Sequence, residues 1–326
     1  MAKPQFDQLR STLEQVQELL GPQVYAVGGC VRDSLLGKEP LDYDFCTPLV
    51  PDEMEELLKQ HNKRCYTSGK RFGTIGFKLN GKLIEVTTFR TEDYELKSRN
   101  PYVAFTKSLS TDLLRRDFTI NAMAFGTQGL VDPMGGQEDL AAKRLRSVGE
   151  AYARLQDDPL RSLRAARFCA QLGLRVEPSL REAMRLLRFD ILGLSKERVK
   201  TELEKILCSP LPIFGLELLI STKILDLLFP ELKPLQKEDD FYFALEFARA
   251  LAKTPPCAAE RWAVLFAFCA RSSKLELSPS RMHERKLLAQ ESLKRYSSYL
   301  RLSKDETGAI AQMLDKNWGF WNEVRG

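Results

Sequence analysis

Two carboxylates separated by one residue, Asp42 and Asp44, are the side chains of this chain that point most directly to chemistry. In an extended strand, residues i and i+2 point to the same side, so these carboxylates would lie side by side. Such closeness is costly unless a cation lies between them. Mg²⁺ commonly takes one or two protein carboxylates and completes its shell with substrate phosphates. The pair therefore predicts metal-assisted phosphoryl or nucleotidyl transfer, although an isolated Asp-x-Asp is more often a turn or a solvated strand edge.

A glycine pair strengthens the catalytic interpretation of the aspartates. Gly28 and Gly29 follow the apolar run 24–27 and precede Arg32 and Asp33. Glycines allow backbone N–H groups to approach phosphates closely, and Arg32 adds a positive charge nearby. The Gly-Lys-Ser/Thr sequence of a P-loop is absent here.

Glu85 is a third candidate carboxylate. Residues 71–79 and 82–89 predict a hairpin around Asn80-Gly81, and Glu85 lies in the apolar second arm. A carboxylate among apolar strand residues is expensive unless it has a partner. Glu85 either faces solvent or turns toward the aspartate pair, and the sequence leaves both options open.

The block 115–125 contains two arginines, an aspartate and an asparagine beside apolar residues. Arginine binds phosphate through two parallel hydrogen bonds, and aspartate accepts from ribose hydroxyls. Arg116, Asp117 and Asn121 are therefore candidates for nucleotide binding. A charged start of a buried helix would give a similar string.

A row of charged residues begins at Asp158, where Pro159 predicts the start of a helix. Arg161, Arg164 and Arg167 follow at steps of three, which places all four side chains along one helix face. Solvated faces usually mix Lys, Glu and Gln. An aspartate with arginines can instead present acceptors and donors to the edge of a base.

The elements that must position these residues change character along the chain. We predict a helix at 5–20, strands at 24–27 and 41–46, and helices at 31–36 and 52–61. Residues 91–114 are predicted as a long connecting loop, and the chain from 178 onward reads as helical. The fold class is therefore α+β, with a small mixed sheet followed by helices.

Composition and charge limit the class of protein. The chain has 326 residues, of which 44% are apolar and 29% are charged, as in globular proteins that can hold two or more domains. Residues 1–150 carry 20 basic and 21 acidic side chains, whereas residues 151–326 carry 29 and 23, which is weak support for a polyanion-binding second half. Seven scattered cysteines, no spanning apolar run and no signal peptide predict a cytoplasmic protein with no membrane association.

Taken together, the motifs resemble those of class II tRNA nucleotidyltransferases (CCA-adding enzymes) and bacterial poly(A) polymerases, in the polymerase-β-like superfamily. Five blocks carry the resemblance in order: Gly28-Gly29-x-Val31-Arg32-Asp33 with Asp42-x-Asp44, Arg115 to Ala122, Asp132-Pro133-x-Gly135-Gly136, Asp157-Asp158-x-x-Arg161, and Ser195-x-Glu197-Arg198.

The resemblance implies a nucleotidyltransferase head at 1–145, a helical neck at 146–210, a helical body at 211–270 and a partly basic, abbreviated tail at 271–326. It implies that two Mg²⁺ ions are held by Asp42 and Asp44, with Glu85 as a third carboxylate. The triphosphate would be bound by Gly28, Gly29 and Arg32, and the sugar and phosphates by Arg116, Asp117 and Asn121. Asp158 and Arg161 would read the base of CTP or ATP, supported by Arg164 and Arg167. The loop 91–114 would correspond to the flexible loop that helps the switch from C to A.

The activity implied is addition of CCA to the 3′ end of tRNA from CTP and ATP, with no obligate protein partner. A-adding or CC-adding enzymes, poly(A) polymerases and a catalytically inactive RNA-binding relative are the alternatives. The length of the loop argues against CC-only addition, and the intact aspartate pair argues against an inactive relative. One departure is that the base-reading motif begins Asp157-Asp158, where the family usually has Glu-Asp.

Overall fold

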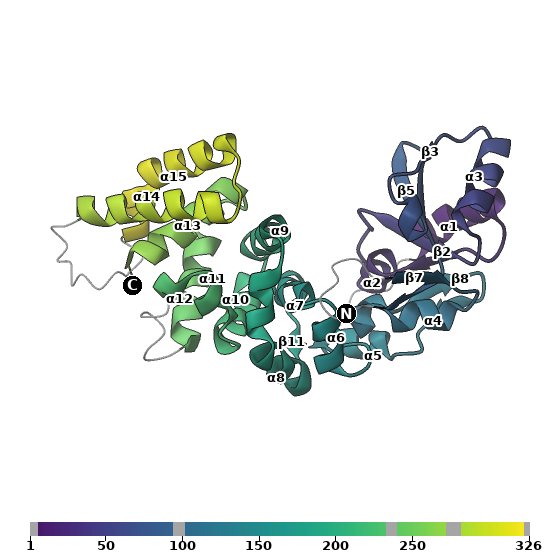
Figure 1. Ribbon diagram of the computed structural model, residues 1–326, viewed down its shortest axis with the longest axis horizontal. Helices are drawn as coiled ribbons and strands as arrows, with labels where there is room; N and C mark the ends of the chain where they lie inside the picture. The colour runs from purple at the N-terminus through teal and green to yellow at the C-terminus, as the bar shows by residue number, and fades with distance from the viewer. Residues whose placement is uncertain (1–5, 94–101, 233–239, 272–281, 323–326) are drawn as a thin grey trace. The chain divides into compact units, whose positions relative to one another are not determined.

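The computed structural model describes residues 6–93, 102–232, 240–271 and 282–322 and divides into two compact units. Unit 1 comprises residues 1–157 and unit 2 comprises residues 158–326. Both are drawn in Figure 1, and each is described by itself. Among the described residues, no helix combines the length and the apolar character that crossing a bilayer requires.

Unit 1 contains a mixed sheet with helices beside it (Figure 1). Its elements are α1 (Asp7–Leu20), β1 (Tyr25–Val27), α2 (Gly29–Leu35), β2 (Tyr43–Thr47), α3 (Pro51–Gln60), β3 (Cys65–Tyr66), η1 (Lys70–Phe72), β4 (Thr74–Leu79), β5 (Lys82–Thr88), β6 (Arg90–Asp93), β7 (Tyr102–Phe105), α4 (Leu109–Leu114), η2 (Thr119–Asn121), β8 (Ala124–Gly126), β9 (Gly129–Val131), α5 (Gly136–Ala141), β10 (Arg144–Leu145) and α6 (Ala151–Asp157).

The central sheet of unit 1 has seven strands in the order β3-β4-β5-β2-β1-β8-β9. Strands β2 and β5 run parallel, and every other neighbouring pair in this sheet is antiparallel. One set of alternating side chains is buried, including Tyr43 and Phe45 on β2 and Ile84 and Val86 on β5. Leu9 and Leu13 of α1, like Met54 and Leu58 of α3, belong to the same buried core of unit 1. The opposite side chains of β2 and β5 at Asp44 and Glu85 stay exposed, so this part of the sheet keeps one polar face.

The prediction of a structureless loop over 91–114 is wrong in part. Strands β6 and β7 pair antiparallel from Arg90 opposite Phe105 to Asp93 opposite Tyr102, and α4 follows. Residues 94–101, the middle of the predicted flexible loop, lie outside the described residues. Strand formation here depends on pairing between two segments, whereas the charged sequence of 91–99 has no alternation of its own to indicate it.

In the described part of unit 2, the regular structure is helical apart from the short strand β11 (Arg175–Val176). Its helices are α7 (Leu160–Leu172), α8 (Pro178–Leu186), η3 (Arg188–Gly193), α9 (Lys196–Leu207), α10 (Pro212–Ser221), α11 (Ile224–Leu228), α12 (Asp240–Ala252), α13 (Ala258–Arg271), α14 (Met282–Tyr299) and α15 (Lys304–Asn322). A mixed sheet followed by helices confirms the predicted α+β class. The finer division into neck, body and tail stays a prediction.

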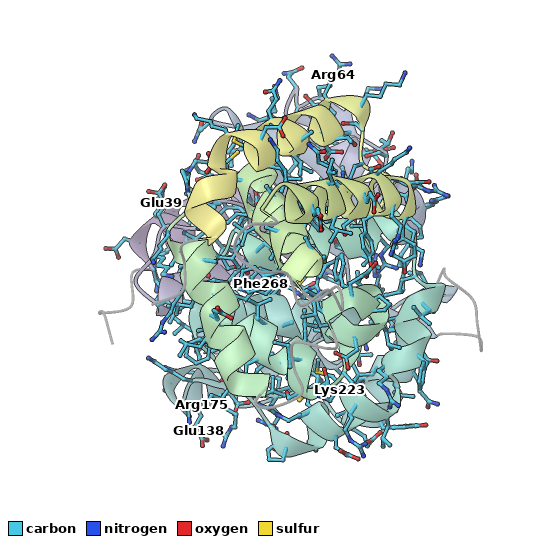
Figure 2. All side chains as sticks on the ribbon, turned by 90° about the vertical axis from the view of Figure 1, so that its left-hand side faces the viewer. Glu39, Arg64, Glu138, Arg175, Lys223 and Phe268 are labelled. Carbon is cyan, nitrogen blue, oxygen red and sulfur yellow. The ribbon has the colours of Figure 1, made fainter. Side chains whose placement is uncertain are left out.

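Close packing in unit 2 fixes α7 against its neighbours. A side chain on Gly215 of α10 would lie 2.6 Å from the Ala166 carbonyl oxygen of α7, so these helices approach at backbone distance. Further along the unit, Phe268 of α13 stacks on Phe247 of α12 with ring centroids 4.7 Å apart. Figure 2 shows Phe268 among the helices. The packing makes α7 a rigid support for its charged residues.

Candidate active site

The parallel pairing of β2 and β5 brings two of the predicted carboxylates together. Asp44 of β2 lies directly opposite Glu85 of β5 in the register, and both side chains are exposed. Asp42 precedes β2 rather than lying within it, and it is also exposed. The sequence left open whether Glu85 turns toward the aspartates, and the register places it beside Asp44.

The electrostatics of Asp44 show how crowded these charges are. Desolvation raises the pKa of Asp44 most, Glu85 and Asp42 raise it further, and Arg116 opposes them. A divalent cation would relieve this repulsion, and three exposed carboxylates supply the oxygen ligands that Mg²⁺ prefers. Among the described residues, no group of three or more such side chains already surrounds a common point. The residues therefore fit a metal in type and position, with their side chains still apart.

The glycine turn lies beside the carboxylates at the start of α2. Gly28 has φ 71° and ψ −124°, a conformation that glycine alone adopts readily. A Cβ at this position would lie 3.2 Å from Nη1 of Arg116, so the missing side chain also leaves room for that guanidinium. The backbone N–H of Gly28 donates to the Met123 carbonyl, which fixes the turn against the segment before β8. The two motifs are thus adjacent in the fold although they are far apart in the sequence.

A chain of hydrogen bonds joins the remaining nucleotide-binding candidates of unit 1. Arg32 donates from Nη1 to Oδ1 of Asn121 at 2.8 Å and pairs with Asp33. Asn121 donates in turn to Oδ1 of Asp117 at 3.1 Å. Asn121 and Asp117 are buried, so their geometry is held by this chain. Arg32, Asn121 and Asp117 come together as predicted, with Asn121 as the link between the glycine turn and the block 115–125.

Asp112, which was not among the predicted site residues, organises the two arginines of that block. Its carboxylate is fully buried and accepts from Nε of Arg115 at 2.9 Å, from Nη2 of Arg116 at 3.1 Å and from the backbone N–H of Arg90 at 3.2 Å. Burial disfavours the charge of Arg116, but Asp112, with smaller contributions from Cys46 and Asp117, outweighs it, so the pKa of Arg116 is raised. The spacing of three and four residues along a helix was the signal available in the sequence.

The base-reading candidates lie in unit 2. Asp158 accepts from the backbone N–H of Leu160 at 3.1 Å and from Nη2 of Arg198 at 3.1 Å. The first bond lies at the start of α7, as predicted, and the second involves a residue of the last motif. Because Asp158 is held from two sides, its carboxylate is oriented before any ligand arrives.

The three predicted arginines of α7 differ in their surroundings. Arg161 is buried, Arg164 is half-buried, and both make polar or charged interactions within the fold. Arg167 is buried, donates to Oε1 of Glu202 on α9 at 3.1 Å and lies over the Phe168 ring. This geometry suits Arg167 to a supporting role behind the helix. Asp157 ends α6 and pairs with Arg154.

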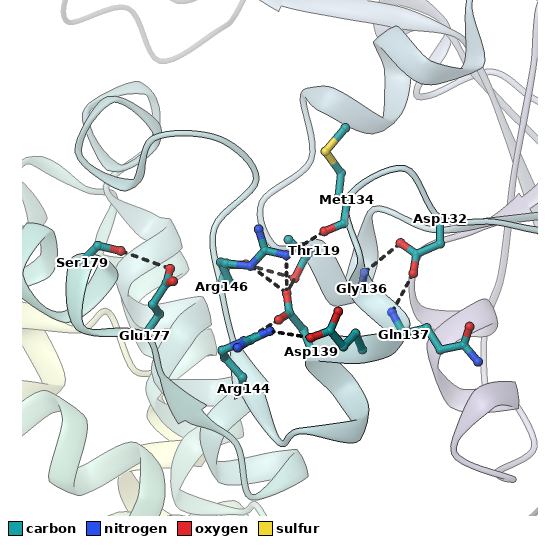
Figure 3. Close-up of polar contacts among 11 residues, drawn as sticks. Thr119, Asp132, Met134, Gly136, Gln137, Asp139, Arg144, Arg146, Glu177 and Ser179 are labelled. Carbon is teal, nitrogen blue, oxygen red and sulfur yellow. Dashed lines mark hydrogen bonds and ion pairs between the residues drawn. The ribbon is translucent and has the colours of Figure 1, made fainter.

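The motif Asp132 to Gly136 builds structure around the block 115–125 (Figure 3). The Asp132 carboxylate accepts from the backbone N–H groups of Gly136 and Gln137 at 2.7 and 2.8 Å, which satisfies the start of α5. Asp139 of α5 is fully buried and accepts from the Thr119 hydroxyl at 2.6 Å. Since Thr119 begins η2, this contact fixes the turn that carries Asn121.

The chain is similar in sequence to known families and proteins. Residues 24–146 match the family described as "Poly A polymerase head domain", and residues 173–236 match "Probable RNA and SrmB- binding site of polymerase A". The chain is 43% identical to the CCA-adding enzyme of Bacillus pumilus over 220 residues, which are 67% of this chain and 53% of that protein. It is 37% identical to the CCA-adding enzyme of Geobacillus stearothermophilus over 265 residues, which are 81% of this chain and 63% of that protein. The chain thus spans a little over half the length of these relatives.

Solved structures agree with the sequence comparison. The crystal structure of a Bacillus stearothermophilus CCA-adding enzyme in complex with CTP matches with a TM-score of 0.67 and 28% identity, over 99% of this chain and 82% of the other. The Thermotoga maritima CCA-adding enzyme complexed with tRNA matches with a TM-score of 0.63 and 22% identity, over 96% of this chain and 81% of that one, which shows the shared fold.

Proposed function

Because this chain belongs to the family of poly(A) polymerase head-domain proteins that includes CCA-adding enzymes, we propose that it adds CCA to the 3′ end of tRNA. Its substrates would be tRNA, CTP and ATP, its product besides the extended RNA would be pyrophosphate, and no obligate protein partner would be required. The observation that carries the proposal is Asp44 opposite Glu85, beside a glycine turn contacted by Arg116. The similarity to a CCA-adding enzyme that binds CTP supports the choice of substrate.

The family relationship favours dependence on a divalent metal in general, and we assign two Mg²⁺ ions to the exposed carboxylates. Asp42 and Asp44 would hold them, with Glu85 as the third ligand. When bound, such ions activate the attacking RNA 3′-hydroxyl and stabilise the pyrophosphate leaving group. The raised pKa of Asp44 supports this assignment, because desolvation and the nearby Glu85 and Asp42 all disfavour its charged form, which a bound cation would favour.

The triphosphate would be bound by Gly28, Gly29 and Arg32, on the side of β2 where β1 lies. Arg32 already has its guanidinium oriented by Asp33 and Asn121, so little conformational entropy is lost when phosphate binds. Arg116 is fixed by Asp112 and projects toward Gly28, which suits it to neutralise phosphate charge. Asp117 and Asn121 would bind the sugar and phosphates from the same hydrogen-bonded chain.

Selection of the base would belong to Asp158 and Arg161 of α7. A carboxylate and a guanidinium together supply the acceptors and donors that distinguish the edge of cytosine or adenine from that of uracil. Arg198 holds Asp158, and Arg164 and Arg167 would support the helix face. Protein side chains thus would replace a nucleic acid template.

A cytoplasmic location is part of the proposal, because tRNA is the substrate. Three related activities use the same residues: addition of A alone, addition of CC alone, and synthesis of poly(A) tails. A catalytically inactive RNA-binding relative is the alternative outside enzymes. The carboxylates cost electrostatic free energy without a metal, so a protein that only binds RNA would gain nothing from them.

Incorporation of labelled CTP and ATP into a tRNA lacking CCA tests the proposal. We expect incorporation in Mg²⁺, none in excess chelator, and none by Asp42→Ala in either condition. Asp52→Ala is a matched control, because Asp52 is an exposed aspartate of unit 1 paired with Lys70. Undiminished incorporation by Asp42→Ala would refute the metal assignment.

A further inference from the structure

A single row of the register connects the catalytic carboxylates to the far edge of the sheet in unit 1. Tyr66 of β3 lies opposite Gly76 of β4, Gly76 opposite Glu85 of β5, and Glu85 opposite Asp44 of β2. Directly paired residues point to the same side of a sheet. The exposed face that carries Glu85 and Asp44 therefore continues over Gly76 to Tyr66.

This continuation of the face is apolar and open. Tyr66 is 39% exposed, and Leu83, which precedes Glu85 by two residues and shares its side of β5, is 52% exposed. A Cβ built on Gly76 would lie 3.5 Å from Cβ of Tyr66 and 3.6 Å from Cδ1 of Leu83, so these two side chains meet over the glycine. Tyr66, Gly76 and Leu83 form what we call the Tyr66 patch.

Basic residues border the Tyr66 patch. Lys78 of β4 is exposed and lies directly opposite Leu83, so it points to the same face. Arg64 immediately precedes β3 and is exposed (Figure 2). An aromatic ring beside cationic side chains is the combination that binds single-stranded nucleic acid, through base stacking and contacts to phosphate.

The strand order gives the patch a direction relative to the reaction. The phosphate-binding residues Gly28 and Gly29 follow β1, which lies on one side of β2, whereas β5, β4 and β3 lie on the other side. In nucleotidyl transfer the attacking and leaving oxygens are roughly in line. If pyrophosphate leaves toward β1, the RNA 3′-hydroxyl must approach the carboxylates from the side of β5.

We propose that the Tyr66 patch is the acceptor subsite, which binds the 3′-terminal nucleotide of the RNA against Tyr66 and Leu83. The proposal rests on the proposed function and names the place of its second substrate. Neighbouring strands are about 4.8 Å apart, so Tyr66 lies about 10 Å from Glu85 along the row. A nucleotide stacked on the patch spans this distance, and its 3′-hydroxyl reaches the carboxylates while its phosphate lies near Lys78.

Steady-state kinetics with a CC-ended tRNA minihelix test the assignment. Loss of a base–aromatic contact costs about 1–3 kcal/mol, and we expect the lower part of this range for a partly exposed ring. Tyr66→Ala should therefore raise the KM for RNA about five- to tenfold. The KM for ATP should stay unchanged, and Tyr66→Phe, which keeps the aromatic ring, should have the wild-type KM for RNA. Tyr152→Ala is the matched control, because Tyr152 is 40% exposed on α6 of the same unit. An unchanged KM for RNA, or an equal rise in both KM values, would overturn the subsite.

Photo-crosslinking separates this proposal from the proposed function. A minihelix with a 3′-terminal 4-thiouridine is irradiated with the wild-type chain, and the crosslinked peptide is identified by mass spectrometry. Crosslinks within 64–66 or 76–83 support the subsite whether or not nucleotides are incorporated. Crosslinks found only on other segments overturn it even if incorporation is normal. Crosslinking at the Tyr66 patch without any incorporation would refute the proposed transferase activity and would still support the patch as an RNA-binding site.

Discussion

Asp112→Asn is expected to have a large effect, although Asp112 lies outside the carboxylates that we propose to be catalytic. The native carboxylate is fully buried and accepts from Arg115, Arg116 and the backbone N–H of Arg90. Asparagine keeps the shape of the side chain but carries no charge, so two largely buried guanidinium groups lose their counterion. Removing one partner of a buried ion pair costs about 3–5 kcal/mol, and we expect about 3 kcal/mol because the amide oxygen still accepts one bond.

This loss should appear as a fall in melting temperature of unit 1. For a domain of this size, 1 kcal/mol corresponds to about 2–4 °C, so about 3 kcal/mol predicts a fall of about 6–12 °C. All three tryptophans, Trp262, Trp318 and Trp321, belong to unit 2, so tryptophan fluorescence reports that unit. Calorimetry should therefore show the shift of Asp112→Asn, whereas the fluorescence transition shifts less.

The control for Asp112→Asn is Asp52→Asn. Asp52 also pairs with a cation, Lys70, but its side chain is 84% exposed, and we expect it to melt with the wild-type protein. Asp112→Asn should in addition raise the KM for nucleotide, since Arg116 is no longer held toward Gly28. An Asp112→Asn protein that melts with the wild type and binds nucleotide normally would refute the reasoning.

Three further predictions follow from the site. Because the pKa of Asp44 is raised, the metal-free folded state loses stability as pH rises from the ordinary value of 3.8 through the raised pKa. Asp44→Asn should therefore flatten this part of the curve of melting temperature against pH, measured in chelator. It should also raise stability at pH 7 while abolishing incorporation. Gly28→Ala forces a Cβ into a conformation with φ 71° and should cost about 1–3 kcal/mol by denaturant unfolding, together with most of the incorporation activity. Two substitutions test base reading: Arg161→Ala removes a base-reading group, and Arg198→Ala releases Asp158. Both should increase misincorporation of UTP against CTP more than they reduce turnover with CTP. Unchanged fidelity in both would contradict base reading by α7.

The local part of the site could be predicted from the sequence because its signals are local. The Gly28-Gly29 turn, the exposed aspartates and the start of α7 near Asp158 all depend on spacing within one element. Glu85 could not be assigned in the same way. Its place beside Asp44 requires the parallel pairing of β2 with β5, and no periodicity within a single strand specifies its neighbour.

The features that sequence reasoning missed depend on contacts between distant segments. Strands β6 and β7 stabilise each other across residues 94–101, which lie outside the described residues. Strand β6 is charged and polar, strand β7 is apolar, and neither sequence specifies the other as its partner. Asp112 lies in the segment predicted as a loop. Its spacing from Arg115 and Arg116 is local, but its full burial and its contact with the backbone N–H of Arg90 depend on the fold. The contact from Arg198 to Asp158 spans 40 residues and likewise has no local signal.

The products formed on three tRNAs, ending at the discriminator base, at C and at CC, test the central claim most directly. The purified chain is given CTP and ATP separately and together, and the extended 3′ ends are sequenced. We predict two C residues and then one A on the first tRNA, one C and one A on the second, and one A on the third. Extension of the CC-ended tRNA only, with none of the other two, C residues with no A on any tRNA, or long A tails would contradict full CCA addition.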